Sequence, residues 1–237
     1  MKVLEIFHKS RGVYGVRRVK KVLESQGIKS SLFGIRKKFH KYSLVAKATK
    51  RYKAFKDSIS KLCSSPNLLN QKFYTNKPNE FRVSDFTYIK TSQGFKYLTV
   101  VMDLFSRRIV GWELSNNMDS KMILSAMNKA VSQRNPRQNL IIHSDRGSQY
   151  SSHIYQEFLA KHKFKCSMSS PGNPYDNSPA ESFFHSLKVE WLSGERFINL
   201  DDLYFSVLEY IEVFYNRQRL HSYLDYLSPV SFERKTA

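Results

Sequence analysis

Cysteine is scarce in this sequence, which holds only Cys63 and Cys166 among 237 residues. Two isolated cysteines, with no CxxC pair and no even-numbered framework, are typical of a reducing compartment and argue against a disulfide-stabilised fold. His8, His40 and Cys63 are too scattered along the chain to predict a zinc site.

Long apolar runs are absent as well. No run approaches the roughly 20 residues that a membrane-spanning helix needs. The first residues, MKVLEIFHKSRG, lack the apolar core of a signal peptide. We therefore expect a protein that is neither exported nor inserted in a membrane.

Acidic residues are rare in the first third of the chain. Residues 1–80 contain 20 Lys and Arg against 4 Asp and Glu, a net charge of +16, whereas residues 81–237 contain 19 against 16, a net charge of +3. Such a basic block is typical of a segment that binds nucleic acid through its phosphates. An anionic membrane surface or a merely solvated basic face are alternatives. Apolar and aromatic residues are interleaved with the charges, which favours a folded nucleic-acid-binding module.

The segment from Tyr14 to Tyr42 predicts two short helices around a turn. Gly27 stands where the first helix would end, and Ser30 or Ser31 can cap the second. A helix-turn-helix and a plain helical hairpin both fit this pattern. The candidate DNA-binding residues are the basic ones on the two helices: Arg17, Arg18, Lys20, Lys21, Arg36, Lys37 and Lys38.

The composition predicts three regions: a basic helix-turn-helix-like module over 1–45, a basic linker over 46–78, and a core with C-terminal helices over 79–234. In the core, three strands in antiparallel sequence are followed by a βαβ-like alternation. The expected fold class is α/β, with a mixed five-stranded sheet flanked by helices. The two last helices are expected at about 179–192 and 200–219.

Three acidic residues stand at unusual positions in this core. Asp85 lies in the middle of a predicted strand, where aspartate is disfavoured, Asp145 ends a buried strand, and Glu181 begins a helix. Taken singly, Asp145 could only end a strand and Glu181 could only compensate a helix dipole. Together, three carboxylates suit magnesium, which prefers oxygen ligands, and a pair of such ions can drive phosphoryl transfer.

The spacing and the surrounding motifs carry a family resemblance. Thirty-five residues separate Asp145 from Glu181, and five motifs occur in order: VSDFTYI, YLTVVMDLFSRRIVGW, HSDRGSQY, YDNSPAESFFHSLKVE and FYNRQRLHSYLDYLSPVSFE. Over residues 14–234 the chain resembles the OrfB, or second-frame, transposases of two-frame bacterial insertion sequences, within the retroviral-integrase-like DDE superfamily. The resemblance implies a ribonuclease-H-like core.

The resemblance also implies an activity: magnesium-dependent DNA strand cleavage and strand transfer at the ends of an insertion sequence. Asp85, Asp145 and Glu181 would be the catalytic, metal-binding residues, with two Mg²⁺ ions and Mn²⁺ as an alternative. Lys188 matches a position that contacts DNA ends in related integrases, and His185 shares the helix face of Glu181. Both are candidate DNA-binding residues.

The implied partners are duplex DNA, both terminal repeats and target, the first-frame product of the same element, and further copies of the chain in a homo-oligomer on DNA. The implied location is the bacterial cytoplasm, in association with the nucleoid. Two other functions were weighed: a catalytically inactive DNA-binding remnant that represses its own element, and a simple ribonuclease-H-type nuclease. The intact triad argues against the first, and the basic module argues against the second.

One residue departs from the family pattern. Members usually have a tryptophan three positions before the first aspartate, where this chain has Arg82. An arginine facing solvent would be a mild change, whereas one facing the core would threaten folding or activity. Three other polar residues in the motifs are expected to be structural: Asp103 and Asp176 as turn-forming or loop-ordering residues, and His143 as a hydrogen-bonding one.

Overall fold

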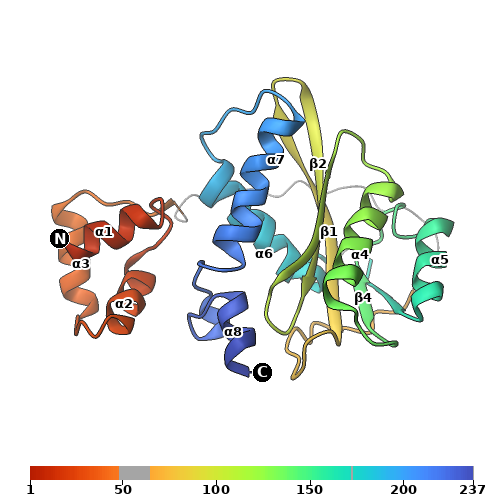
Figure 1. The fold of residues 1–237 in the computed structure, drawn as a ribbon, viewed down its shortest axis with the longest axis horizontal. Coiled ribbons are helices and arrows are strands. Elements are labelled where there is room, and N and C mark those ends of the chain that lie inside the picture. Colours follow the sequence, from red (N-terminus) through yellow and green to blue (C-terminus); the bar gives the residue numbers. More distant parts are fainter. Residues whose placement is uncertain (48–64, 172, 237) are drawn as a thin grey trace. The chain divides into compact units, whose positions relative to one another are not determined.

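The computed structural model describes residues 1–47, 65–171 and 173–236 (Figure 1). The chain divides into two compact units. The first contains Met1–Phe55, His185–Glu195 and Leu220–Leu227, and the second contains Lys56–Phe184, Arg196–Arg219 and Ser228–Ala237. Within the described residues, no helix combines the length and the hydropathy of a membrane-spanning helix.

The first unit begins with three helices, α1 (Lys2–Lys9), α2 (Val16–Ser25) and α3 (Leu32–Lys41). Gly27 has φ +74° after the end of α2, and the Ser31 side chain accepts a hydrogen bond from the Gly34 backbone N–H at the start of α3. The two predicted helices and their turn are thus confirmed, while α1 was not predicted. Phe7 of α1 packs edge-to-face on Phe39 of α3, with 5.5 Å between ring centroids.

The second unit contains the predicted mixed sheet of five strands, in the order β3-β2-β1-β4-β5. The strands are β1 (Phe81–Thr91), β2 (Gly94–Asp103), β3 (Ile109–Ser115), β4 (Ile141–Ser144) and β5 (Lys165–Met168). The first three pair antiparallel, and β4 pairs parallel with both β1 and β5. The change from antiparallel to parallel pairing therefore falls between β1 and β4.

Helices cover both faces of this sheet (Figure 1). On one face lie α4 (Ser120–Arg134) and α5 (His153–His162), whose apolar residues form a common core with the sheet. Gly111 of β3 permits the closest approach, because a Cβ there would stand 2.2 Å from the Ala126 carbonyl oxygen of α4. On the other face lie α6 (Ser178–Ser186) and α7 (Leu200–Leu208), and Trp112 of β3 donates a hydrogen bond to Glu212 at 3.0 Å.

The predicted helices of the C-terminal part are present, but each changes its winding. The helix α6 continues as the π-helical segment η3 (Leu187–Leu192), and α7 continues as the π-helical segment η4 (Glu209–Tyr215). A π-helix bonds each N–H five residues back, so its turn is wider than that of an α-helix. Side-chain positions extrapolated from regular helical spacing therefore shift beyond residue 186.

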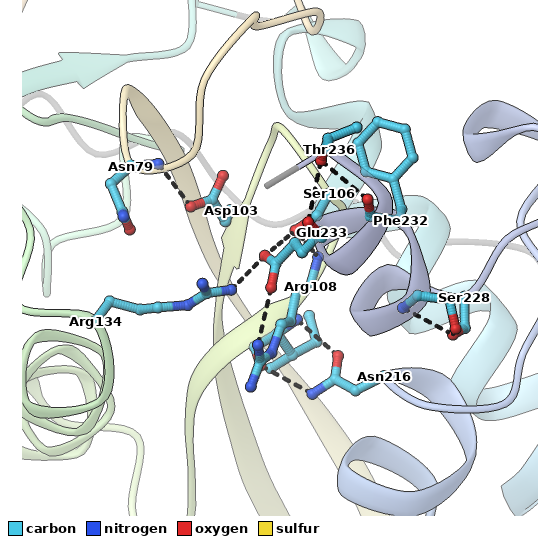
Figure 2. A network of polar contacts seen from close by, with 12 residues as sticks. Asn79, Asp103, Ser106, Arg108, Arg134, Asn216, Ser228, Phe232, Glu233 and Thr236 are labelled. Atoms are coloured by element: carbon cyan, nitrogen blue, oxygen red, sulfur yellow. Dashed lines mark hydrogen bonds and ion pairs between the residues drawn. The ribbon is translucent and has the colours of Figure 1, made fainter.

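The last helix, α8 (Pro229–Thr236), is anchored to the second unit by one carboxylate (Figure 2). Glu233 accepts hydrogen bonds from Ser106 at 2.6 Å, from Arg108 at 2.9 Å, and from Arg134. Burial alone would raise the pKa of Glu233, but the hydrogen bonds from Ser106 and Arg134 outweigh burial and lower it. The contacts tie α8 to the β2–β3 turn and to the end of α4.

The predicted linker over 46–78 is described by the structure only in part. Residues 48–64 lie outside the described part of the chain, but residues 65–78 pack on the second unit. Leu69 is buried, and the side chains of Asn67 and Gln71 each donate a hydrogen bond of 2.9 Å to Asp176. The polar residues that suggested a linker are held by a buried carboxylate more than 100 positions later, which local composition does not reveal.

Candidate active site

The two predicted metal-binding aspartates belong to neighbouring parallel strands: Asp85 lies inside β1, and Asp145 directly follows β4. The β1–β4 register pairs Phe81 with Ile141 and Val83 with His143. Asp85 and Asp145 each stand two positions beyond the last of these pairs, so they lie at the same level at the carboxyl ends of the paired segments. The pairing of β1 with β4 thus relates the backbone positions of two residues that are 60 positions apart in the sequence.

Local hydrogen bonds hold Asp85 in its strand despite its poor β-propensity. Its Oδ1 accepts a hydrogen bond from the Phe86 backbone N–H at 2.8 Å. Its backbone carbonyl accepts a hydrogen bond from Thr99 Oγ1 of β2 at 3.1 Å, while its Cα is paired with Val100. The residue is half-buried, so its carboxylate lies at the surface of the unit without being fully solvated.

Asp145 opens a tight turn immediately after β4. Its Oδ1 accepts a hydrogen bond from the Gly147 backbone N–H at 3.0 Å. A Cβ at Gly147 would stand 3.1 Å from that same Oδ1 and 3.6 Å from the Phe86 ring. The turn therefore passes close to the residue that follows Asp85, and glycine is the residue that leaves the Asp145 carboxylate undisturbed.

Glu181 lies in the first turn of α6 and is exposed. Partial burial raises its pKa above the usual glutamate value. Among the described residues, no three His, Cys, Asp or Glu side chains lie close enough together to hold a metal ion. In the described part of the chain, Asp85, Asp145 and Glu181 therefore do not form a three-carboxylate cluster, an arrangement that repulsion between like charges would oppose.

The loop after Asp145 also contains residues that sequence reasoning did not single out. Tyr150 and Ser84 are both fully buried, and their hydroxyl oxygens lie 2.9 Å apart. Ser84 directly precedes Asp85, and Tyr150 closes the HSDRGSQY motif. The only sequence signal for either was its place inside a motif, because their contact joins residues 66 positions apart.

His143 is structural, as expected. Its Nδ1 lies 2.8 Å from Ser167 Oγ and its Nε2 lies 3.2 Å from Ser169 Oγ, so both ring nitrogens face hydroxyl groups. Burial lowers the pKa of His143 to about 4. The imidazole is therefore neutral at pH 7 and is engaged on both sides.

Asp103 and Asp176 make the contacts expected of loop-ordering residues. Asp103 accepts a hydrogen bond from the backbone N–H of Asn79 at 2.9 Å (Figure 2). It also accepts one from the backbone N–H of Phe105 at 3.0 Å. Asp176 accepts a hydrogen bond from the Ser170 backbone N–H at 2.7 Å, in addition to those from residues 67 and 71.

Arg82 faces the core, with an exposed fraction of 1%. The fold accommodates it with a 2.7 Å hydrogen bond to Asn79 Oδ1 and a 3.3 Å hydrogen bond to the Ala130 carbonyl. Burial lowers the pKa of Arg82 to about 10, and the charge of Asp103 opposes that change. The departure from the family's tryptophan is therefore an arginine with buried polar partners.

The basic residues of the first unit fall into two groups. Arg17, Arg36, Lys37 and Lys38 are exposed, as a phosphate-binding surface requires. Three others contact protein groups: Arg18 donates to the Leu220 carbonyl at 2.9 Å and lies 3.6 Å from Glu190, while Lys20 and Lys21 pair with Glu24 at 3.0 and 3.4 Å. The expectation that all seven residues are available to DNA therefore does not fit Arg18, because its guanidinium is held within the unit.

His185 and Lys188 follow Glu181 along the same helical stretch and are half-buried. His185 lies in α6, whereas Lys188 lies in the π-helical segment η3. Regular α-helical spacing therefore does not continue from Glu181 as far as Lys188. Both residues belong to the first unit, and Glu181 belongs to the second.

The second unit thus has a five-stranded mixed sheet between helices, with Asp85 inside β1 and Asp145 directly after β4. The family described as "Integrase core domain" matches residues 75–174 and again 181–236. A transposase for insertion sequence element IS904 of Lactococcus lactis subsp. lactis (strain IL1403) is 40% identical over 234 residues, covering 98% of this chain and 92% of the relative. Transposase InsF for insertion sequence IS3A of Escherichia coli (strain K12) is 40% identical over 233 residues, covering 98% and 81%.

The fold also resembles that of a chain in the simian T-cell lymphotropic virus intasome, solved in complex with PP2A regulatory subunit B56 gamma. The TM-score is 0.55 at 14% sequence identity, over 97% of this chain and 73% of that one. The chain belongs to the OrfB-type DDE transposases of insertion sequences. Its mixed sheet and flanking helices have the ribonuclease-H-like fold of an integrase core domain.

Proposed function

We propose that this transposase cleaves one DNA strand at the end of its insertion sequence and joins the freed end to target DNA, with Asp85, Asp145 and Glu181 as its metal-binding residues. The observation that carries the proposal is the register of β1 and β4, which sets Asp85 and Asp145 at one level on adjacent strands. Neither family membership nor spacing in the sequence depends on that register, so it is independent support.

The donor set fits a hard divalent cation. The three side chains offer carboxylate oxygens, which magnesium prefers, and the nearest histidine is already engaged by two serines. Mn²⁺ accepts the same donors. Two bound ions would supply neutralisation of the charge that develops on the attacking and leaving oxygens of an in-line displacement.

The residues of this chain contribute placement and charge to the two steps. In cleavage, a water oxygen bonds to phosphorus at the element end, the 3′-oxygen leaves and takes up a proton, and a 5′-phosphate remains. In transfer, that 3′-hydroxyl loses its proton and bonds to a target phosphorus, whose own 3′-oxygen leaves. Asp85 and Asp145 would fix the position of the site, and Glu181 would complete the set of carboxylates that hold the cations.

The DNA partner is assigned to the first unit by charge. Arg17, Arg36, Lys37 and Lys38 are exposed there, and residues 1–55, with which that unit begins, contain 16 Lys and Arg against 2 Asp and Glu. Lys188 and His185 are proposed contacts for the element end. The first-frame product and further copies of the chain are proposed partners in the complex on DNA, because two element ends must be joined to one target.

A joining assay tests this function. A terminal-repeat duplex with a pre-cut 3′ end is incubated with a supercoiled plasmid, magnesium and the protein, together with the first-frame product. We expect joined products with the wild type and none with Asp145→Asn, although both bind the duplex equally. Equal joining by both proteins would refute the assignment of Asp145. Binding without joining by the wild type would instead favour a repressor that acts only through its DNA-binding unit.

A further inference from the structure

A buried side-chain contact lies directly beside the two aspartates. The hydroxyl oxygens of Tyr150 and Ser84 are 2.9 Å apart, and both residues have an exposed fraction of 0%. Ser84 precedes Asp85 on β1, and Tyr150 follows Asp145 by five positions. The contact therefore joins the two segments of chain that carry the aspartates.

This contact lies just beyond the last paired residues of β1 and β4. The β1–β4 register ends with Val83 and His143, and β4 itself ends at Ser144. At the level of the aspartates, within the described residues, the two segments no longer share paired backbone positions. At that level the hydrogen bond between the Ser84 and Tyr150 side chains connects the two segments instead. Breaking a buried hydrogen bond of this kind is costly, because the remaining partner is left without one.

Two further hydrogen bonds link Tyr150 to the Asp145 carboxylate. The Tyr150 backbone N–H donates to the Gly147 carbonyl at 3.0 Å, and the Gly147 N–H donates to Asp145 Oδ1 at 3.0 Å. Burial raises the pKa of Tyr150 well above its usual value, and the nearby charges of Asp85 and Asp145 raise it further. The hydroxyl thus stays protonated, and both carboxylates are close enough to act on it.

We propose that Tyr150 is a positioning residue which, through its hydrogen bond to Ser84, sets the separation of Asp85 and Asp145 and thereby the affinity of the site for magnesium. This inference rests on the proposed function, since it takes the aspartates as metal ligands. Residues that hold metal ligands in place typically change metal affinity when substituted, although they never touch the metal.

The chain offers a matched control in Tyr155. This residue is also fully buried, and its ring packs edge-to-face on that of Tyr150 with 5.3 Å between centroids. Its hydroxyl has no hydrogen-bond partner in the part of the chain that the structure describes. Tyr155→Phe therefore removes a buried hydroxyl next to Tyr150 without breaking a contact to the aspartate segments.

The test measures the magnesium-dependent rise in the unfolding midpoint of the full chain without DNA. We expect Tyr150→Phe and Ser84→Ala each to raise the magnesium concentration at half-maximal stabilisation by about tenfold, the lower end of the range for residues behind metal ligands. The double variant should need the same magnesium concentration for half-maximal stabilisation as either single variant, because the two changes remove the same contact. Tyr155→Phe should match the wild type.

Three results would overturn the inference. A Tyr150→Phe protein with the wild-type magnesium dependence would show that the contact does not set the site. Loss of cooperative unfolding in both single variants without metal would make the contact a requirement of the fold instead. A wild type that magnesium does not stabilise at all would overturn the proposed metal site and this inference together.

Discussion

Arg82 and Asp103 are cross-strand partners in the β1–β2 ladder, and both are buried. Two opposite charges buried this way stabilise each other, and removing one leaves the other uncompensated in a medium of low polarity. Burial raises the pKa of Asp103, while the charges of Arg82 and Arg134 act against that rise. The arginine that departs from the family pattern is thus tied to an aspartate that orders the neighbouring loop.

Arg82→Met should destabilise the protein by about 3 kcal/mol, because it leaves the Asp103 carboxylate without its nearest opposite charge. Asp103 should then take up a proton more readily than in the wild type. The free energy of unfolding in urea measures the loss. In the double variant Arg82→Met/Asp103→Asn, which buries no lone charge, part of the lost stability should return. The interpretation fails if the single variant is as stable as the wild type.

His143 should make the protein less stable in mild acid. Its pKa is lowered to about 4 from an ordinary value of 6.5, so the unfolded chain takes up a proton over this range and the folded chain does not. Stability is therefore fully present above pH 6.5 and decreases as the pH falls towards 4, by about 3 kcal/mol in total.

Unfolding curves between pH 7 and pH 4 measure this effect. In His143→Asn, which cannot titrate, the decrease over that range should be smaller than in the wild type. His153→Asn is the control, because the side chain of His153 is 84% exposed and should contribute little. An unchanged pH dependence in His143→Asn would contradict the assignment.

Gly147→Ala should impair cleavage more than folding. The added Cβ would stand 3.1 Å from Asp145 Oδ1 and 3.1 Å from Gln149 Oε1, which is too close unless one of them moves. A small displacement of a metal-binding carboxylate should lower the cleavage rate by about tenfold, since reaction rates depend steeply on placement. Ser148→Ala, in the same turn but exposed, is the control. Wild-type cleavage by Gly147→Ala would show that the turn tolerates the change.

DNA binding should depend on Lys37 and Lys38 and should weaken as salt rises. If each lysine contacts a phosphate, replacing it by alanine should reduce the slope of log affinity against log salt by about 0.9. Lys20→Ala should have a smaller effect, because Lys20 is 3.0 Å from Glu24 and already paired. Fluorescence anisotropy over a salt series measures the slopes. Identical slopes for Lys37→Ala, Lys38→Ala and the wild type would exclude phosphate contacts by these residues.

Most of the sheet could be predicted from the sequence because its patterns are local. Alternation and β-branched residues predict β1, β2 and β3, and the helical spacing of apolar residues predicts α4 and α5. The short helix α1 was not predicted, because Met1 provides no side-chain cap at its start. The packing of residues 65–78 was not predicted, because it depends on hydrogen bonds to Asp176, which is distant in the sequence.

The candidate site could be predicted as a set of residues but not as an arrangement. The sequence indicates Asp85, Asp145 and Glu181 by their positions and spacing. That Asp85 and Asp145 share one level follows from the pairing of β1 with β4, a long-range contact that no local pattern specifies. The contact between Ser84 and Tyr150 depends on the same pairing, so it too becomes visible only in the folded chain.

The central claim is that Glu181, which the structure does not gather with the two aspartates, joins them around magnesium when DNA is bound. The most direct measurement is calorimetric titration of magnesium into the complex of the full chain with a terminal-repeat duplex, comparing the wild type with Glu181→Gln, Asp85→Asn and Asp145→Asn. We predict that all three substitutions weaken magnesium binding while leaving DNA affinity unchanged. Wild-type magnesium binding by Glu181→Gln, alongside weakened binding by the two aspartate variants, would contradict the account.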